Sequence, residues 1–154
     1  MSDFDRDVVE RQLGRPPRAF RRVIARCPFG LPAVTEQAPF DENGTPFPTQ
    51  FWLTCPHLVA QLARAEAAGG VERWTDAAAA DPALARGLSA AHAEQRALRP
   101  ELPTGVGGAA RTGSLKCLHA HAAFALARPG YALGDRILAE VEPLWPRDGC
   151  CTTV

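Results

Sequence analysis

Residues 49–70, TQFWLTCPHLVAQLARAEAAGG, decide the fold, because they join the pattern of a strand directly to the pattern of a helix. Aromatic and β-branched residues dominate residues 49–55, which is typical of a strand buried on one face. Proline suits the first turn of a helix, and the leucines after Pro56 recur at helical spacing until Gly69-Gly70. The stretch therefore predicts a strand that leads into a helix.

The sequence before this stretch predicts a short helix and two more strands. Residues 3–13 place their apolar side chains on one helical face. Residues 21–26 and 31–39 have extended patterns, and the turn sequence CPFG at 27–30 separates them. We expect these two strands and residues 49–55 to form a small, mainly antiparallel three-stranded sheet.

The sequence after residue 70 is mostly helical. Asp81-Pro82 is a capping pair for the helical pattern of residues 82–99. Residues 114–127 predict another helix, and a last one begins near Asp135 and reaches about Trp145, with only a short alanine-rich turn expected elsewhere. The predicted fold class is α+β, with the sheet packed with about five helices.

Length and composition are those of one globular domain. The chain has 154 residues, of which 46% are hydrophobic and 22% charged, and its formal net charge is zero. No apolar stretch reaches ~18 residues, and the first residues lack a signal-peptide pattern. We expect residues 1–146 to form a single domain, residues 147–154 to form a flexible cysteine-containing tail, and the protein to be cytoplasmic, with no nucleic-acid or membrane partner.

The internal cysteines each lie at the end or the start of a predicted element. Cys27 ends a strand, Cys55 precedes the helix that begins at Pro56, and Cys117 lies four residues before His121 on a predicted helix. Residues at this spacing share a helical face. In the cytoplasm, cysteines more often bind metal or do chemistry than form disulfides.

Together these residues predict a metal site. Cys27, Cys55, Cys117 and His121 would form the tetrahedral Cys₃His set that zinc prefers. The three cysteines with Cys150 or Cys151 would instead suit an iron–sulfur cluster. The predicted cofactor is therefore zinc or an iron–sulfur cluster. The alternative for each residue is burial in the core, where a cysteine acts as a small hydrophobic residue and a histidine bonds to a backbone carbonyl.

A glycine-rich loop, TGVGGAARTGS at 104–114, precedes the helix that contains Cys117. A Walker A motif is excluded, because a serine stands where that motif needs lysine and no hydrophobic strand precedes the loop. Backbone N–H groups before a helix can still hold an anionic small molecule. A flexible connector is the alternative. The predicted anion-binding residues are Gly107, Gly108, Arg111, Thr112 and Ser114.

Three functions are compatible with these features. The first is a metal-binding protein, with the possibility of a metalloenzyme that acts on an anionic small molecule. The second is a metal-free thiol enzyme, in which Cys55 at a helix N-terminus is the nucleophile and His57 or His121 its base. His119 and Lys116 are further catalytic candidates. The third is a non-catalytic module that docks a protein partner on its alanine-rich helices.

Four strings resemble one known family. They are RCPFGLP (26–32), GTPFPTQFWLTCPHL (44–58), EAAGGVERW (66–74) and LKCLHAHAAFALA (115–127). The family is the bacterial domain of unknown function 501, found mainly in actinobacteria, and the resemblance extends from about Leu13 to Trp145. It implies an α+β cytoplasmic protein and supplies no catalytic residues.

Overall fold

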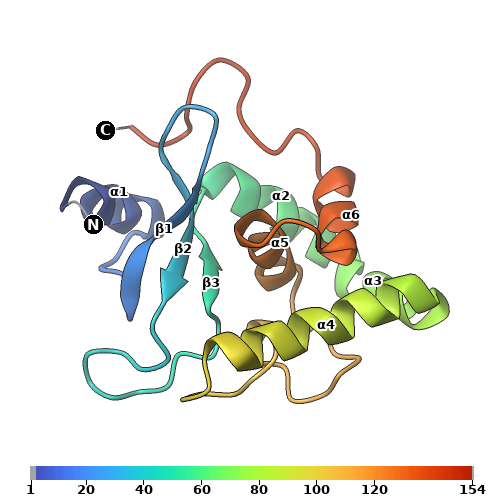
Figure 1. Cartoon of the computed structure of the whole chain (residues 1–154). Helices are drawn as coiled ribbons and strands as arrows, with labels where there is room; N and C mark the ends of the chain where they lie inside the picture. The colour runs from blue at the N-terminus through green and yellow to red at the C-terminus, as the bar shows by residue number, and fades with distance from the viewer. Residues whose placement is uncertain (1–2, 154) are drawn as a thin grey trace.

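A three-stranded antiparallel sheet forms one side of the molecule in the computed structural model, which describes residues 3–153 (Figure 1). Its strands are β1 (Phe20–Arg26), β2 (Pro32–Gln37) and β3 (Phe51–Leu53), in the order β1-β2-β3. The central strand β2 pairs with both neighbours, so that Val34 is opposite Ala25 on one side and Leu53 on the other. The predicted small antiparallel sheet is confirmed.

The edge strand β1 is irregular and rich in arginine. Its register with β2 shifts at three points, between Phe20 and Arg22, between Val23 and Ala25, and between Ala25 and Arg26. Arg22 pairs with Glu36 of β2 at 3.0 Å, and Arg26 pairs with Asp5 at 2.8 Å. The second pair ties this strand to the N-terminal helix.

Helices supply the rest of the described fold, which is therefore α+β as predicted. They are α1 (Asp3–Leu13), α2 (Pro56–Ala67), α3 (Gly70–Ala80), α4 (Pro82–Leu98), α5 (Leu118–Ala127) and α6 (Ala132–Glu140), with a short 3-10 turn at Val106–Gly108. The predictions for α1, α2 and α4 are close to these bounds. Asp81 caps α4 as expected, since its carboxylate accepts from the backbone N–H of Ala83 at 2.9 Å.

Helix α3 is longer than the short turn that the sequence predicted. Gly69 adopts a left-handed conformation with φ of +85°, which lets the chain reverse within one residue. Gly70 then begins α3, and a Cβ atom there would lie 2.6 Å from the carbonyl oxygen of Ala65. The two glycines that end α2 therefore also start the next helix, and this accounts for the additional helix.

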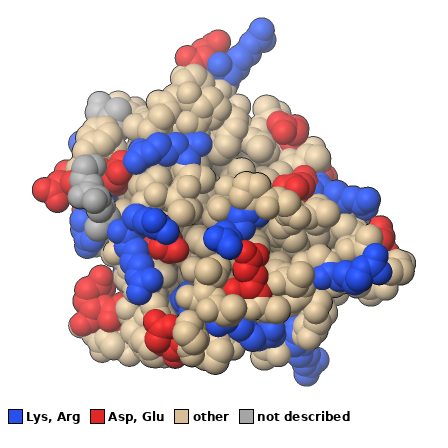
Figure 2. All heavy atoms as spheres, viewed as in Figure 1, with Lys and Arg blue, Asp and Glu red and all other residues tan. Residues whose placement is uncertain are grey.

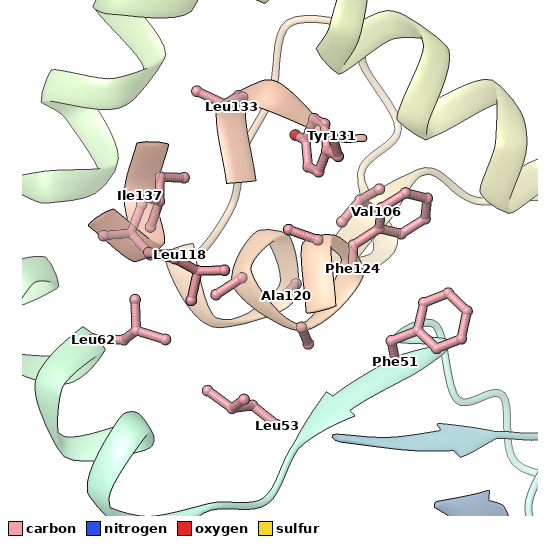
Figure 3. Close-up of a cluster of buried hydrophobic side chains, with 14 of the residues drawn as sticks. Phe51, Leu53, Leu62, Val106, Leu118, Ala120, Phe124, Tyr131, Leu133 and Ile137 are labelled. Atoms are coloured by element: carbon pink, nitrogen blue, oxygen red, sulfur yellow. The ribbon is translucent and has the colours of Figure 1, made fainter. Parts of the chain in front are cut away.

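Helix α5 is the centre of the core. Figure 3 shows side chains of β3, α2 and α6 directed toward it from several sides. Residues 120–125 of α5 are all buried, and the aromatic ring of Phe124 packs 5.6 Å from that of Phe51 and 5.5 Å from that of Tyr131. A helix that is apolar on every face belongs inside a protein, and its many alanines let the neighbouring elements approach closely.

Helix α5 also begins later than predicted, at Leu118 rather than Ser114. The cause is Lys116, which has φ of +67°, a left-handed value that interrupts any helix. Cys117 follows as the N-cap in an extended conformation with φ of −151°. Helix α6 ends at Glu140, earlier than predicted, since Pro143 cannot donate a helical hydrogen bond.

The C-terminal tail returns across the molecule to α1. Figure 1 shows it leaving α6 and ending on the side where α1 and the β1–β2 turn lie. The side chain of Gln12 donates to the Thr152 hydroxyl at 3.3 Å, and Arg11 donates to the backbone carbonyl of Thr153 at 3.3 Å. The tail thus has partners in α1. Its predicted flexibility stays a prediction, as does the domain boundary at residue 146.

The surface carries charges of both signs. On the face shown in Figure 2, lysine and arginine side chains alternate with aspartate and glutamate. Within residues 3–153, no helix combines the length and apolar character needed to cross a bilayer.

Candidate functional site

A pocket of about 540 Å³ lies between α1, β3, α2 and α5. Strand β3 leads into α2 at Cys55-Pro56, and these two elements form two sides of the pocket. Residues of α1 and α5 form the other sides. The wall is mostly apolar, and its main hydrophobic residues are Leu13, Phe51, Trp52, Leu53, Val59 and Ala120. This is the lining expected of a site for an organic molecule.

A few polar groups interrupt this apolar wall. Thr54 is only 1% exposed, and its hydroxyl oxygen has no hydrogen-bond partner among the described residues; the same is true of Oε1 of Gln12. An unpaired buried hydroxyl costs about 1–3 kcal/mol. Arg15 is exposed at the pocket and forms no ion pair with any residue from 3 to 153. Among residues 3–153, the pocket is therefore bordered by a guanidinium without an ion-pair partner and by a covered hydroxyl without a hydrogen-bond partner.

Cys117 contributes a half-buried thiol to the wall. The backbone before it is strained, because Lys116 is left-handed and the N–H of Cys117 bonds to the carbonyl of Leu115 two residues back, at 2.9 Å. The sulfur accepts from the N–H of Ala120 at 3.4 Å. Burial raises the pKa of the Cys117 thiol, and the carboxylate of Glu66 acts in the same direction. The thiol is protonated at neutral pH.

His119, a predicted catalytic candidate, lines the pocket but is held by α2. Its Nδ1 lies 3.1 Å from Oε2 of Glu66, and its Nε2 lies 3.1 Å from the carbonyl oxygen of Val59. Each ring nitrogen of His119 therefore already has a hydrogen-bond partner in α2.

The structure does not bring the predicted Cys₃His ligands together. Cys117 lies in the pocket wall, whereas His121 lies in the core and bonds to the hydroxyl of Tyr131 at 2.7 Å and to the carbonyl of Leu115 at 2.9 Å. The shared helical face that the sequence predicted does not form, because Cys117 precedes the helix in an extended conformation. In residues 3–153 no group of three or more His, Cys, Asp or Glu side chains is placed to hold a metal ion.

The other predicted ligands, Cys27 and Cys55, lie beside the C-terminal tail. The Sγ of Cys27 is 3.9 Å from that of Cys150, and the Sγ of Cys55 is 3.9 Å from that of Cys151. Burial raises the pKa of Cys55 to about 12, because it outweighs the N–H groups of the following helix turn, which lower it. The helix N-terminus therefore does not produce the thiolate that the sequence predicted at this position.

The glycine-rich loop uses many of its backbone donors internally. The N–H of Val106 donates to Nδ1 of His92 at 2.9 Å, and Nε2 of His92 bonds to the carbonyl of Ser114 at 3.0 Å, so this ring is a neutral, inward-facing histidine. The N–H of Gly108 bonds to the carbonyl of Gly105, and that of Ser114 bonds to the carbonyl of Arg111. Gly107 adopts φ of +68°, while Thr112 is exposed.

A negative group already lies at the start of α5. Oε2 of Glu66 accepts from the N–H of Leu118, the first residue of the helix, at 2.7 Å. Anion binding by the loop 104–114 remains a prediction.

Sequence reasoning missed several residues of the pocket. The sequence carries no functional signal at Thr54, Gln12 or Arg15, and it shows Glu66 only as an acidic residue near the end of a predicted helix. The pattern of α2 placed Glu66 correctly within its element. Only the long-range packing of α2 against α5 shows its partners, and no local signal carries that information.

Comparison with known proteins identifies a family and nothing closer. Neither the curated proteins nor the solved structures include a match to this chain. A family model described as Protein of unknown function (DUF501) matches residues 23–104, which extend from β1 to the loop after α4 and include Cys55 and Glu66. The match covers more than half of the 154 residues. The chain therefore belongs to the DUF501 family, as the resemblance of its sequence strings implied.

Proposed function

We propose that the pocket between α1, β3, α2 and α5 binds a small organic molecule with an apolar body and one anionic group. The volume of about 540 Å³ lies within the range of small-molecule sites. The observation that carries the proposal is the hydroxyl of Thr54, which is buried in this apolar wall without a partner. The hydroxyl is covered in the structure, so a rotation of the Thr54 side chain would have to turn it toward the ligand. A hydrogen bond formed there would remove the cost of leaving it unpaired.

Arg15 gives the ligand its charge preference. The guanidinium offers a fork of N–H donors that matches a carboxylate or sulfonate, and no carboxylate among residues 3–153 competes for it within ion-pair distance. The apolar part of the ligand would lie against Phe51 and Leu53, and the anionic end would face Arg15.

Binding accounts for the site better than nucleophilic catalysis does. The pKa of Cys117 is raised by burial and that of Cys55 is about 12, so neither thiol is ionised at neutral pH. Both ring nitrogens of His119 face acceptors in α2. A Cys/His metal centre is not part of the proposal, because the residues described contain no group of three or more ligands.

Anilinonaphthalene sulfonate, which has an apolar body and one anion, tests the proposal. We expect saturable binding at one site by fluorescence titration. Arg15→Gln should weaken binding roughly fivefold, since an exposed charge contact contributes about 1 kcal/mol. Arg86→Gln, at an exposed arginine on α4, is the matched control and should bind as the wild type does.

Thr54→Val separates binding from folding. The variant keeps the side-chain volume and removes an unpaired hydroxyl, so the free energy of unfolding should not fall. The affinity for the probe should decrease, because the hydrogen bond to the ligand is lost. Circular dichroism confirms that each variant is folded, because partly folded states also bind this dye. Equal affinity of wild type, Arg15→Gln and Thr54→Val would disprove the proposal.

Thiol chemistry at Cys117 is a second candidate, favoured by the strained backbone at Lys116 beside it. Strain of this kind is common at reactive sites. Alkylation by N-ethylmaleimide decides between the two. If Cys117 reacts faster at neutral pH than the exposed Cys151, it is an activated nucleophile; slower reaction is the result expected of a binding pocket.

A further inference from the structure

Four cysteines form two separate sulfur pairs at one end of the sheet. Cys27 follows β1 and its Sγ lies 3.9 Å from that of Cys150, while Cys55 follows β3 and its Sγ lies 3.9 Å from that of Cys151. The N–H groups of Cys27 and Cys55 bond to the carbonyls of Leu31 and Ala33, at the start of β2. Two neighbouring tail residues thus meet two internal cysteines on either side of the same strand.

The pairing fits disulfide chemistry better than metal binding. Each thiol has one sulfur within 4.0 Å, and no described group contains three or more ligands suited to one metal ion. A disulfide needs only two sulfurs, at about 2 Å, and side-chain rotation can supply the remaining approach. The half-buried Cys117 has no cysteine sulfur within hydrogen-bond distance among the described residues, and so it provides an internal reference.

We propose that Cys27–Cys150 and Cys55–Cys151 are two redox couples that fasten the C-terminal tail to the sheet when the protein meets a small-molecule disulfide such as oxidised glutathione. For each couple, a tail thiol loses its proton and attacks the small disulfide, which forms a mixed disulfide and releases one small thiol. The internal cysteine then loses its proton, attacks the tail sulfur and releases the second small thiol. Two electrons and two protons leave each couple, and one small disulfide becomes two thiols.

Burial sets the order of these steps. Cys151 is exposed and Cys150 is half-buried, whereas Cys27 and Cys55 are only 6% and 2% exposed. The tail thiols therefore meet the reagent first, and the buried thiols complete the disulfides. Oxidation also reaches the pocket, because Cys55 stands between Thr54 and Pro56 of its wall, and Thr152 of the tail bonds to Gln12 of the same wall.

Mass spectrometry of the intact full-length protein tests the proposal and does not depend on ligand binding. Reduced protein is incubated with excess oxidised glutathione, all free thiols are blocked with N-ethylmaleimide in denaturant so that buried cysteines also react, and the product is compared with a sample kept reduced. We expect the loss of four hydrogens, about 4 mass units, and one maleimide, on Cys117. In Cys117→Ser the same loss should occur with no maleimide added.

Single variants in the tail establish the pairing, because Cys150 and Cys151 remain in one peptide on digestion. Cys150→Ser should retain only the link between Cys55 and Cys151, and Cys151→Ser only the link between Cys27 and Cys150. Chymotrypsin, which cuts at Phe51 and Trp52, separates the two internal cysteines. Both substitutions are near the surface, and circular dichroism should show the fold intact.

Each other outcome overturns the proposal. These outcomes are a disulfide between Cys150 and Cys151, links between molecules, pairing with Cys117, and five maleimides after oxidation. Stoichiometric zinc in protein purified under reducing conditions, lost in both tail variants, would assign the same sulfurs to a metal instead. Hydrogen exchange of α1 (Asp3–Leu13) provides a second readout, and it should slow on oxidation in the wild type but not in the double variant Cys150→Ser, Cys151→Ser.

Discussion

Lys116 is the residue where local strain is clearest. Its φ of +67° is unfavourable for any side chain with a Cβ atom, and glycine adopts it freely. We expect Lys116→Gly to raise the free energy of unfolding by up to about 1 kcal/mol, measured by urea denaturation. Lys116→Ala removes the same charge but keeps the Cβ, so it should leave stability unchanged. Equal stabilisation by both variants would show that charge, and not the backbone, is responsible.

His121 makes the stability of the protein depend on pH. Burial lowers its pKa from 6.5 to about 4, and burial also lowers the pKa of His92. Below pH 6.5 the unfolded chain therefore binds more protons than the folded chain, so stability is complete above this pH and falls as pH decreases toward 4. His121 alone accounts for about 3 kcal/mol over this interval, at 1.36 kcal/mol per pH unit.

Urea denaturation at a series of pH values checks this prediction. His121→Asn should reduce the slope of unfolding free energy between pH 6.5 and 4.5, whatever its effect on stability at pH 7. The assignment fails if His121→Asn and the wild type have the same slope.

At the scale of helices, two glycines predict opposite effects of the same substitution. A Cβ atom at Gly87 of α4 would meet nothing within 4 Å, whereas one at Gly134 of α6 would lie 2.6 Å from the Cβ of Ala125 and 2.7 Å from the carbonyl oxygen of His121. Gly87→Ala should therefore stabilise by about 1 kcal/mol through helix propensity. Gly134→Ala should destabilise by about 1–3 kcal/mol, since α6 must move away from α5. Thermal and urea unfolding measure both, and effects of the same sign would contradict the close packing of α5 and α6.

Elements with a local signature could be predicted from the sequence, and those set by one unusual residue could not. Pro56 and Asp81 mark the starts of α2 and α4, because capping and proline geometry depend on immediate neighbours. Nothing in the sequence around Lys116 indicates its left-handed backbone, which delays α5 and places Cys117 off the helical face shared with His121. The separation of Cys117 from His121 follows from that one residue.

At the scale of the whole molecule, Arg99 joins the helical part to the sheet. It is 2% exposed at the end of α4, and it donates to the carbonyls of Ala38 at 3.2 Å, Pro48 at 3.3 Å and Phe47. These carbonyls belong to the segment between β2 and β3. Burial lowers the pKa of Arg99, while the carboxylates of Glu101 and Glu36 act in the opposite direction.

Replacing Arg99 with methionine removes its hydrogen bonds to the carbonyls of Ala38 and Phe47. The Pro48 carbonyl keeps the side chains of Gln95 and Thr104 as donors. We expect Arg99→Met to lower the free energy of unfolding by about 3 kcal/mol and to speed proteolysis within residues 38–50. Arg86→Met, at an exposed arginine of the same helix, should change neither quantity. Equal stability of the two variants would show that Arg99 does not hold this segment.

The pocket and the sulfur pairs are properties of the whole molecule, which is why the sequence indicated only some of their parts. Residue type alone marks Cys55 and Cys117 as candidates. The sulfur nearest to Cys55 belongs to Cys151, which is far away in the chain. Cys117 lies off the helical face that it was expected to share with His121. Thr54 gave no signal, since only the convergence of α1, β3, α2 and α5 makes its hydroxyl unusual.

The irregular register of β1 has a consequence for association between copies of the protein. An open edge strand offers unpaired N–H and C=O groups to a strand of another molecule, and regular, apolar edges therefore promote fibrous aggregation. Three register shifts along β1 break the even spacing that such pairing needs, and Arg21, Arg22 and Arg26 place exposed positive charge along the same edge. The strand that ties α1 to the sheet therefore also makes its own edge unsuited to pairing with a strand of a neighbouring molecule.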